Sequence, residues 1–92
     1  MDISNEQIQA TVRALEKLGA RRILLFGSFL DSPATARDID IAVEGIPLNR
    51  LLDADVAVHD ILCAPFDLFS REENPAFFEI IQQRGRVLYE SR

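Results

Sequence analysis

Aspartate and isoleucine alternate along Asp38, Ile39, Asp40 and Ile41, and two further apolar residues follow. Successive side chains of a strand point to opposite faces of a sheet, so the pattern predicts a strand from about Ile39 to Val43 that buries its isoleucines. Asp38 and Asp40 then share the other face at one edge of the sheet. Because like charges repel at short range, we expect a hard divalent cation such as Mg²⁺ between these two carboxylates.

The dipeptide Gly27-Ser28 directly follows the apolar run from Ile23 to Phe26 and precedes Asp38 by ten residues. The block from Arg22 to Phe26 predicts a short buried strand. Gly27 at its end lets the backbone approach a phosphate, and Ser28 adds a hydroxyl at the expected N-terminus of a helix. We therefore predict that this corner binds a triphosphate. Ser28 is also suited to be an N-cap residue, a role that is compatible with phosphate binding.

A third aspartate, Asp67, lies alone in the apolar segment from Phe66 to Phe69, which predicts another strand. A carboxylate inside a sheet requires a partner or a metal. Three aspartates on adjacent strands would make a two-metal site, in which Asp38 and Asp40 bind metal and Asp67 ligates the second ion or accepts a proton. Two alternatives stay open: Asp38 and Asp40 line a solvated strand edge, or Asp67 caps the next turn through Ser70.

The rest of the chain alternates predicted helices with strands, which indicates an α/β (α+β) chain. Capping residues, glycines and prolines give the start and stop signals. The predicted segments are a helix from Ser4-Asn5-Glu6-Gln7 to Gly19, a helical turn and loop from Phe29 to Arg37, a helix from Leu48 to Leu62 that ends at Pro65, a helix from Pro75 to Gly85 and an edge strand from Val87 to Tyr89. With 92 residues and no linker or repeat, the chain is expected to form a single domain, residues 1–92.

Composition limits the classes of partner and compartment. The hydrophobic fraction of 48% indicates a globular chain, and without an apolar run of about eighteen residues we expect no membrane span. The net charge of -5 has the wrong sign for binding long nucleic acid. A nucleoside triphosphate stays compatible with it, because a bound divalent ion supplies positive charge. The single cysteine and the lack of a signal segment predict a cytoplasmic protein.

In order and spacing, Gly27-Ser28, Asp38-Ile39-Asp40 and Asp67 resemble the nucleotidyltransferase signature of the DNA polymerase beta superfamily, and most closely its minimal nucleotidyltransferase (MNT) group. The resemblance covers nearly the whole chain, because these proteins also open with a helix and end with an Asn-Pro helix running into Gly-x-x-Leu-Tyr-Glu, here Gly85 to Glu90. It implies a nucleotidyltransferase fold with a small mixed sheet and flanking helices, Mg²⁺ and a nucleoside triphosphate, often ATP. It also implies a partner, since many stand-alone MNT proteins are antitoxins of HEPN-domain ribonuclease toxins, some by adding AMP to a toxin tyrosine.

The chain departs from the family pattern at two positions. Members commonly carry a basic residue three positions after the serine and a serine before the first aspartate, where this chain has Asp31 and Arg37. An acid at the mouth of a triphosphate site is unfavourable. Arg37 either swings onto a phosphate, which adds it to Gly27 and Ser28 as a nucleotide-binding candidate, or neutralises Asp38.

Three functions are compatible with these residues. The first is an enzyme that transfers a nucleoside monophosphate, AMP from ATP, to a hydroxyl group of a HEPN toxin. The second is a catalytically inactive antitoxin that only binds its toxin. The third is a nucleotidyltransferase that acts on a small molecule such as an aminoglycoside, although such enzymes usually carry an additional helical domain. The intact set of Asp38, Asp40 and Asp67 favours the first.

Four other residues are predicted to lie outside the site or at its border. His59 is expected to be a surface residue and not a metal ligand, because no His or Cys lies at a metal-like spacing. Cys63 is expected in the core. Phe29 and Leu30 either pack under the first helix or form a partner patch beside the site. The second alternative predicts that Phe29→Glu weakens a complex with the toxin and leaves the fold intact.

Overall fold

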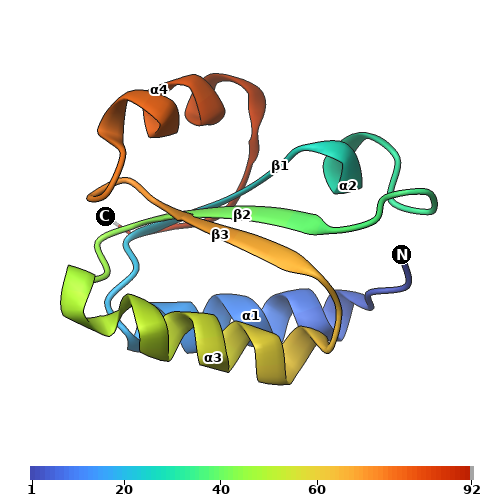
Figure 1. Cartoon of the computed structure of the whole chain (residues 1–92), viewed down its shortest axis with the longest axis horizontal. Helices are drawn as coiled ribbons and strands as arrows, with labels where there is room; N and C mark the ends of the chain where they lie inside the picture. The colour runs from blue at the N-terminus through green and yellow to red at the C-terminus, as the bar shows by residue number, and fades with distance from the viewer. Residues whose placement is uncertain (92) are drawn as a thin grey trace.

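The computed structural model describes residues 1–91, which form a four-stranded sheet with helices on both faces (Figure 1). The strands are β1 (Arg22–Phe26), β2 (Ile39–Glu44), β3 (Phe66–Ser70) and β4 (Arg86–Glu90). The helices are α1 (Asn5–Lys17), α2 (Ser28–Asp31), α3 (Leu51–Leu62) and α4 (Pro75–Arg84), with a 3-10 turn, η1 (Leu48–Arg50), directly before α3. The strand order is β3-β2-β1-β4. Because β1 is antiparallel to β2 and β4 while β2 and β3 are parallel, the expected mixed sheet and α/β (α+β) class are confirmed.

The larger core lies between the sheet and the helices α1 and α3, which pack side by side on one face (Figure 1). Ile39, Ile41 and Val43 of β2 belong to this core and are at most 1% exposed. Leu15 of α1 and Val58 of α3 are fully buried in the same cluster. Burial of three branched apolar side chains therefore decides which face of β2 is left for its aspartates, as the alternating sequence predicts.

A smaller core lies on the opposite face, which α4 covers (Figure 1). Phe78 and Ile81 of α4 pack there with Leu24 of β1 and Ala42 of β2. Three further rings extend this core with centroids 5.3 to 6.2 Å apart: Phe26, Phe69 and Phe77. The aspartates at the start of β2 and β3 lie on the same face, yet they stay at least partly exposed because α4 does not bury them.

Two of the helices, α1 and α4, begin where the sequence signals place them. The Ser4 hydroxyl accepts a hydrogen bond from the Gln7 backbone N–H, and the Gln7 side chain accepts one from the Ser4 N–H, which confirms the capping box. Asn74 caps α4 by accepting from the backbone N–H of Phe77, directly before Pro75. The longest helix, α1, has 13 residues, and nowhere in residues 1–91 is a helix long and apolar enough to span a bilayer.

The helix predicted from Leu48 to Leu62 is wrong at its start and correct at its last residue. Leu48 belongs to η1, and α3 ends at Leu62, before Pro65 is reached. The helix stops because Cys63 adopts a left-handed conformation, with φ of 49°, that turns the chain toward β3. The prediction that Cys63 lies in the core is also wrong. This side chain is exposed, because it follows the last helical turn and does not continue the buried face of α3.

Phe29 lies in the core rather than in a partner patch. Its side chain is 6% exposed and belongs to the larger core, and Leu30 is half-buried against the same cluster. The short helix α2 turns Phe29 inward, where a phenyl ring gains more free energy from burial than it would at the surface. The expectation that Phe29→Glu leaves the fold intact is therefore wrong.

Candidate metal and nucleotide site

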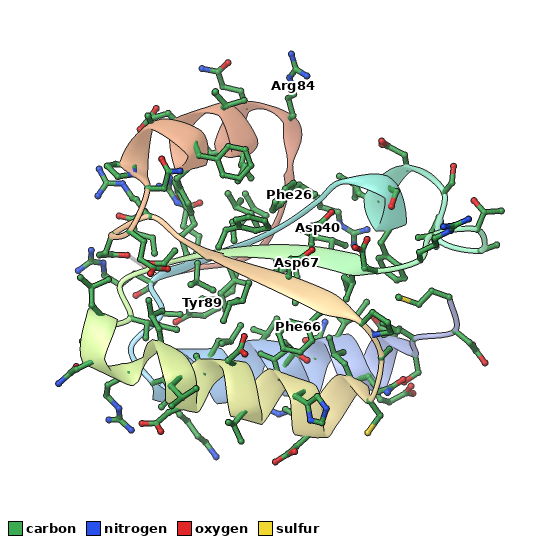
Figure 2. The ribbon with its side chains drawn as sticks, in the orientation of Figure 1. Phe26, Asp40, Phe66, Asp67, Arg84 and Tyr89 are labelled. Carbon is green, nitrogen blue, oxygen red and sulfur yellow. The ribbon has the colours of Figure 1, made fainter. Side chains whose placement is uncertain are left out.

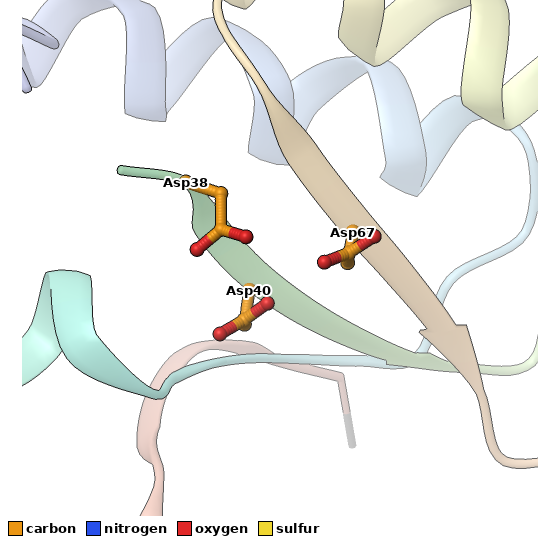
Figure 3. Close-up of side chains that lie close together, drawn as sticks. All are labelled: Asp38, Asp40 and Asp67. Atoms are coloured by element: carbon orange, nitrogen blue, oxygen red, sulfur yellow. The ribbon is translucent and has the colours of Figure 1, made fainter. Parts of the chain in front are cut away.

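The carboxylates of Asp38, Asp40 and Asp67 converge where β2 and β3 begin (Figure 3). Asp40 is paired in register with Asp67 on the parallel strand β3 and with Phe26 at the end of β1, so a row of residues crosses the sheet. Asp38 directly precedes β2 and has the same parity as Asp40. One oxygen from each carboxylate lies within 4.8 Å of the others. The sequence prediction that these aspartates share one face is thus confirmed.

Asp40 lies among these charges. Burial raises the pKa of the Asp40 carboxyl, and the negative charges of Asp38 and Asp67 raise it further. A hydrogen bond from protonated Asp40 to Asp67 has the same effect on this pKa. Asp67 therefore interacts across the strands, and within residues 1–91 no hydrogen bond joins it to Ser70, whose hydroxyl donates to Glu72 instead. A cation between the carboxylates would relieve their repulsion.

Gly27 links β1 to α2 and packs directly against Asp40. Its φ of 78° and ψ of -160° lie in a region that is open to glycine and costly for other residues. A Cβ at this position would collide with the Asp40 carboxylate and lie 3.1 Å from its Cγ. Glycine is therefore required twice, once by the backbone conformation and once by the aspartate beside it.

Ser28 is the first residue of α2, and its side chain is exposed. Gly27 occupies the N-cap position of α2, and no side chain caps this helix. The prediction that Ser28 is an N-cap residue is therefore wrong. Its hydroxyl makes no hydrogen bond within the described residues. The chain thus has an exposed hydroxyl, without a hydrogen bond inside residues 1–91, directly after the glycine that packs against Asp40.

Arg37 is exposed and forms no ion pair with any residue from 1 to 91. The sequence left two roles open for Arg37, and the structure does not show the second one, an ion pair that neutralises Asp38. Within residues 1–91, neither Asp38 nor Arg37 has an ion-pair partner.

A cleft of about 450 Å³ opens beside Gly27, bordered by β1, α2 and α4. Its lining is mostly apolar, with one acid and one base: Phe26, Leu30, Phe77, Ile80, Ile81, Asp31 and Arg84. The three carboxylates of the triad do not line this cleft. It adjoins them through Gly27, which lines the cleft on one side and packs against Asp40 on the other. An apolar surface therefore borders the acidic cluster.

Arg84 is the residue at this site that the sequence reasoning missed. It lies in the last turn of α4 (Figure 2), four residues after Ile80 and seven after Phe77, which puts the three on one helix face. The spacing is readable in the sequence, but only the packing of α4 on the sheet makes this face a wall of the cleft. Within the described chain, the side chains of Arg84 and Asp31 form no ion pair, so both are available to a ligand.

Two residues lie well apart from this site. His59 and Cys63 are at the end of α3, on the opposite face of the sheet from the carboxylates. His59 is exposed, with Nδ1 3.5 Å from Oδ1 of Asp60, which confirms the predicted surface position.

Comparison with known proteins adds no family assignment to this geometry: no protein-family model matches the chain, and a search of curated proteins finds no match. The MNT resemblance therefore rests on the residues themselves, and their roles in binding and catalysis stay predictions.

Proposed function

We propose that this chain is a Mg²⁺-dependent nucleotidyltransferase, which transfers a nucleoside monophosphate from a nucleoside triphosphate to a hydroxyl group. One observation carries the proposal: Asp38, Asp40 and Asp67 hold carboxylate oxygens within 4.8 Å of one another beside the Gly27 turn. Packing gives no reason for this arrangement, because three neighbouring negative charges oppose folding unless a cation is bound. The MNT resemblance of the same residues supports the same reaction.

The donor set fits Mg²⁺. Carboxylate oxygens are the protein ligands that this small, hard ion prefers, and it usually keeps several waters, so one oxygen from each of a few aspartates suffices. Asp38 and Asp40 would hold the metal, with Asp67 as a further ligand or as a base. When bound, Mg²⁺ neutralises phosphate charge and lowers the pKa of an attacking hydroxyl.

The proposal assigns phosphate binding to the exposed groups around the Gly27 turn. Ser28 offers a free hydroxyl, and Arg37 offers a guanidinium that is unpaired within residues 1–91. Asp67 is the most exposed carboxylate of the triad, so it is the one that an acceptor hydroxyl reaches first. In that position Asp67 would accept the acceptor's proton as the acceptor oxygen bonds to the α-phosphorus, the bond from this phosphorus to the β-phosphate oxygen breaks, and pyrophosphate leaves.

The apolar cleft supports a nucleoside as the remainder of the ligand. Its volume of about 450 Å³ falls within the range of small-molecule sites, and the rings of Phe26 and Phe77 offer aromatic surface on which a nucleobase can stack. The MNT resemblance adds ATP as the expected nucleotide. Since Asp31 would repel phosphate, the triphosphate in this proposal lies on the Ser28 side of the turn and only the nucleoside enters the cleft.

The acceptor in this proposal is a tyrosine hydroxyl of a helical partner, as the MNT resemblance implies for antitoxins of HEPN-domain toxins. A second function, that of a catalytically inactive antitoxin, is favoured by one observation. Asp31 lines the cleft at a position where MNT proteins commonly carry a basic residue. Incubation with Mg²⁺, each of the four nucleoside triphosphates labelled at the α-phosphate, and the product of an adjacent gene, where that gene encodes a small helical protein, separates the two. Label on the partner supports the enzyme, whereas neutralisation of the partner without any label supports the inactive antitoxin.

Mg²⁺ and ATP together should raise the melting temperature, because they bind the folded chain and not the unfolded one. At one hundred times Kd, linkage adds about 2.7 kcal/mol of stability. Each kcal/mol raises the melting temperature of a domain of this size by about 4–8 °C. Differential scanning fluorimetry measures the shift, and EDTA should abolish it. An equal shift with ATP in EDTA would count against a metal at the carboxylates.

Gly27→Ala should damage both the fold and the site. Backbone strain costs about 1–3 kcal/mol of unfolding free energy, and the new Cβ displaces the Asp40 carboxylate. We expect a lower urea midpoint and loss of Mg²⁺-dependent ATP binding in titration calorimetry. Gly19→Ala is the matched control, because Gly19 also has positive φ, 115°, but its Cβ would meet the Gly45 oxygen at 3.4 Å, far from the site. Gly19→Ala should lose stability and keep Mg²⁺-dependent ATP binding. If Gly27→Ala also bound ATP as the parent does, Gly27 would not be part of the nucleotide site.

A further inference from the structure

An apolar stripe runs along the outer side of η1 and α3. Five large hydrophobic side chains are exposed among residues 1–91, and three of them lie here: Leu48 at 57%, Leu52 at 75% and Val56 at 53% exposure. Leu52 and Val56, four residues apart, lie in line on one face of α3, and Leu48 lies in the 3-10 turn directly before this helix. We call these three side chains the α3 stripe. Ala54, Val58 and Leu62 bury the other side of the same helix in the larger core. Helix α3 therefore carries apolar residues on two faces, and only one of them is covered.

Acidic residues flank the α3 stripe on both sides. At 3.6 residues per turn, Asp53 and Asp60 lie along one edge and Asp55 along the other, and all three are exposed. Two nearby groups moderate this charge: Arg50 lies 3.6 Å from Asp53, and His59 lies 3.5 Å from Asp60. Both pairs are exposed, so each contributes little. The stripe is thus an apolar line between acidic edges.

This charge pattern decides what can cover the stripe. If a second copy packed α3 against α3, acids would face acids in either helix orientation, which disfavours self-association. An anionic membrane surface is disfavoured for the same reason, since interfacial helices carry lysine or arginine beside their apolar face. A partner helix with an apolar face and basic edges would cover the apolar stripe and place positive charges opposite the flanking aspartates.

We infer that the α3 stripe docks a partner protein that presents an apolar helix face edged by lysine or arginine. Leu52, the most exposed of the three side chains, is the central anchor of this surface. The surface lies across the sheet from the three carboxylates. Helix α3 covers one face of the sheet (Figure 1), and Asp40 alternates along β2 with Ile39 and Ile41, which are buried on that face. Docking therefore leaves the carboxylates accessible and does not depend on their proposed chemistry.

A pair of synthetic helical peptides tests the inference. Both carry leucines at every third or fourth position, and one has lysines along the edges of the leucine face where the other has glutamates. Cys63, the single cysteine of the chain, is exposed at the end of α3, so an environment-sensitive dye on its thiol reports binding. We expect saturable binding of the lysine peptide, no binding of the glutamate peptide, and amide NMR shifts in the unlabelled protein that concentrate at residues 48–63.

Matched variants make the outcome decisive. Leu52→Glu should lower the affinity for the lysine peptide by at least about tenfold. Val87→Glu, at a side chain of β4 that is 50% exposed, should leave this affinity unchanged. The charge-reversed double variant Asp53→Lys with Asp60→Lys should bind the glutamate peptide instead. Amide shifts that concentrate around Asp40 and Asp67, or an affinity that Leu52→Glu does not alter, would overturn the inference. So would a dimer in light scattering that Leu52→Glu dissociates.

Discussion

Asp40→Asn should lower the rate of nucleotidyl transfer by about two to three orders of magnitude, with no loss of stability in the metal-free protein. The amide keeps the shape of the carboxylate but removes the charge that binds a divalent ion. Asp38→Asn and Asp67→Asn should act in the same direction, because each removes one of the three charges that converge at the site. Asp2→Asn, at an exposed residue outside the site, is the control and should keep the parent rate.

The stability half of this prediction depends on pH. Because burial and the neighbouring charges raise the pKa of Asp40, the folded chain binds a proton at this residue more readily than the unfolded chain. The free energy of unfolding therefore falls as pH rises from the unfolded pKa through the raised folded pKa. Asparagine removes this penalty, so Asp40→Asn should be as stable as the parent or more stable at about pH 7, with no gain at about pH 3. Urea denaturation in EDTA measures both.

Neutralisation of the partner in cells then separates catalysis from binding. If the chain modifies its partner, the asparagine variants lose neutralisation together with transfer. If Asp38→Asn and Asp40→Asn neutralise the partner as well as the parent does, the protein works by binding alone. If all three asparagine variants transferred nucleotide at the parent rate, the three carboxylates would have no part in the reaction.

Local patterns account for the parts of the fold that could be predicted. The capping box at Ser4, the helix start at Pro75 and the alternation along β2 each depend on near neighbours in the sequence, and the structure confirms all three. The meeting of Asp40 with Asp67 depends on more, because it requires β2 and β3 to be parallel and in register. The sequence indicated this meeting only indirectly, because a lone aspartate in an apolar strand was expected to require a partner. Asp67 is exposed, however, and it meets Asp40 because the two residues are paired in register.

Helical spacing could not predict which side of a helix faces the sheet. Leu48 and Leu52 occur in the same apolar series as Val58 and Leu62, yet the first two are exposed and the last two are buried. Periodicity groups residues on a helix, but contacts between distant segments decide which group is covered. For the same reason Arg84 could not be assigned to the cleft before the position of α4 was known.

Phe29→Glu should unfold most of the protein. Removing a buried phenylalanine costs about 3–5 kcal/mol, and an unpaired carboxylate in the core adds a desolvation penalty. Small domains are stable by only about 5–15 kcal/mol. Since Phe29 is 6% exposed within the larger core, these costs approach or exceed the whole stability of the chain. Far-ultraviolet circular dichroism and urea denaturation measure the loss.

Leu52→Glu is the matched control, because the same substitution then falls on a side chain that is 75% exposed. It should change the free energy of unfolding by no more than about 0.5 kcal/mol. A weakened partner complex would then have different meanings in the two variants, loss of the fold in Phe29→Glu and loss of a contact in Leu52→Glu. If Phe29→Glu instead kept the urea midpoint of the parent, Phe29 would lie at the surface, and the segment from residue 29 to 37 would again be open to a partner.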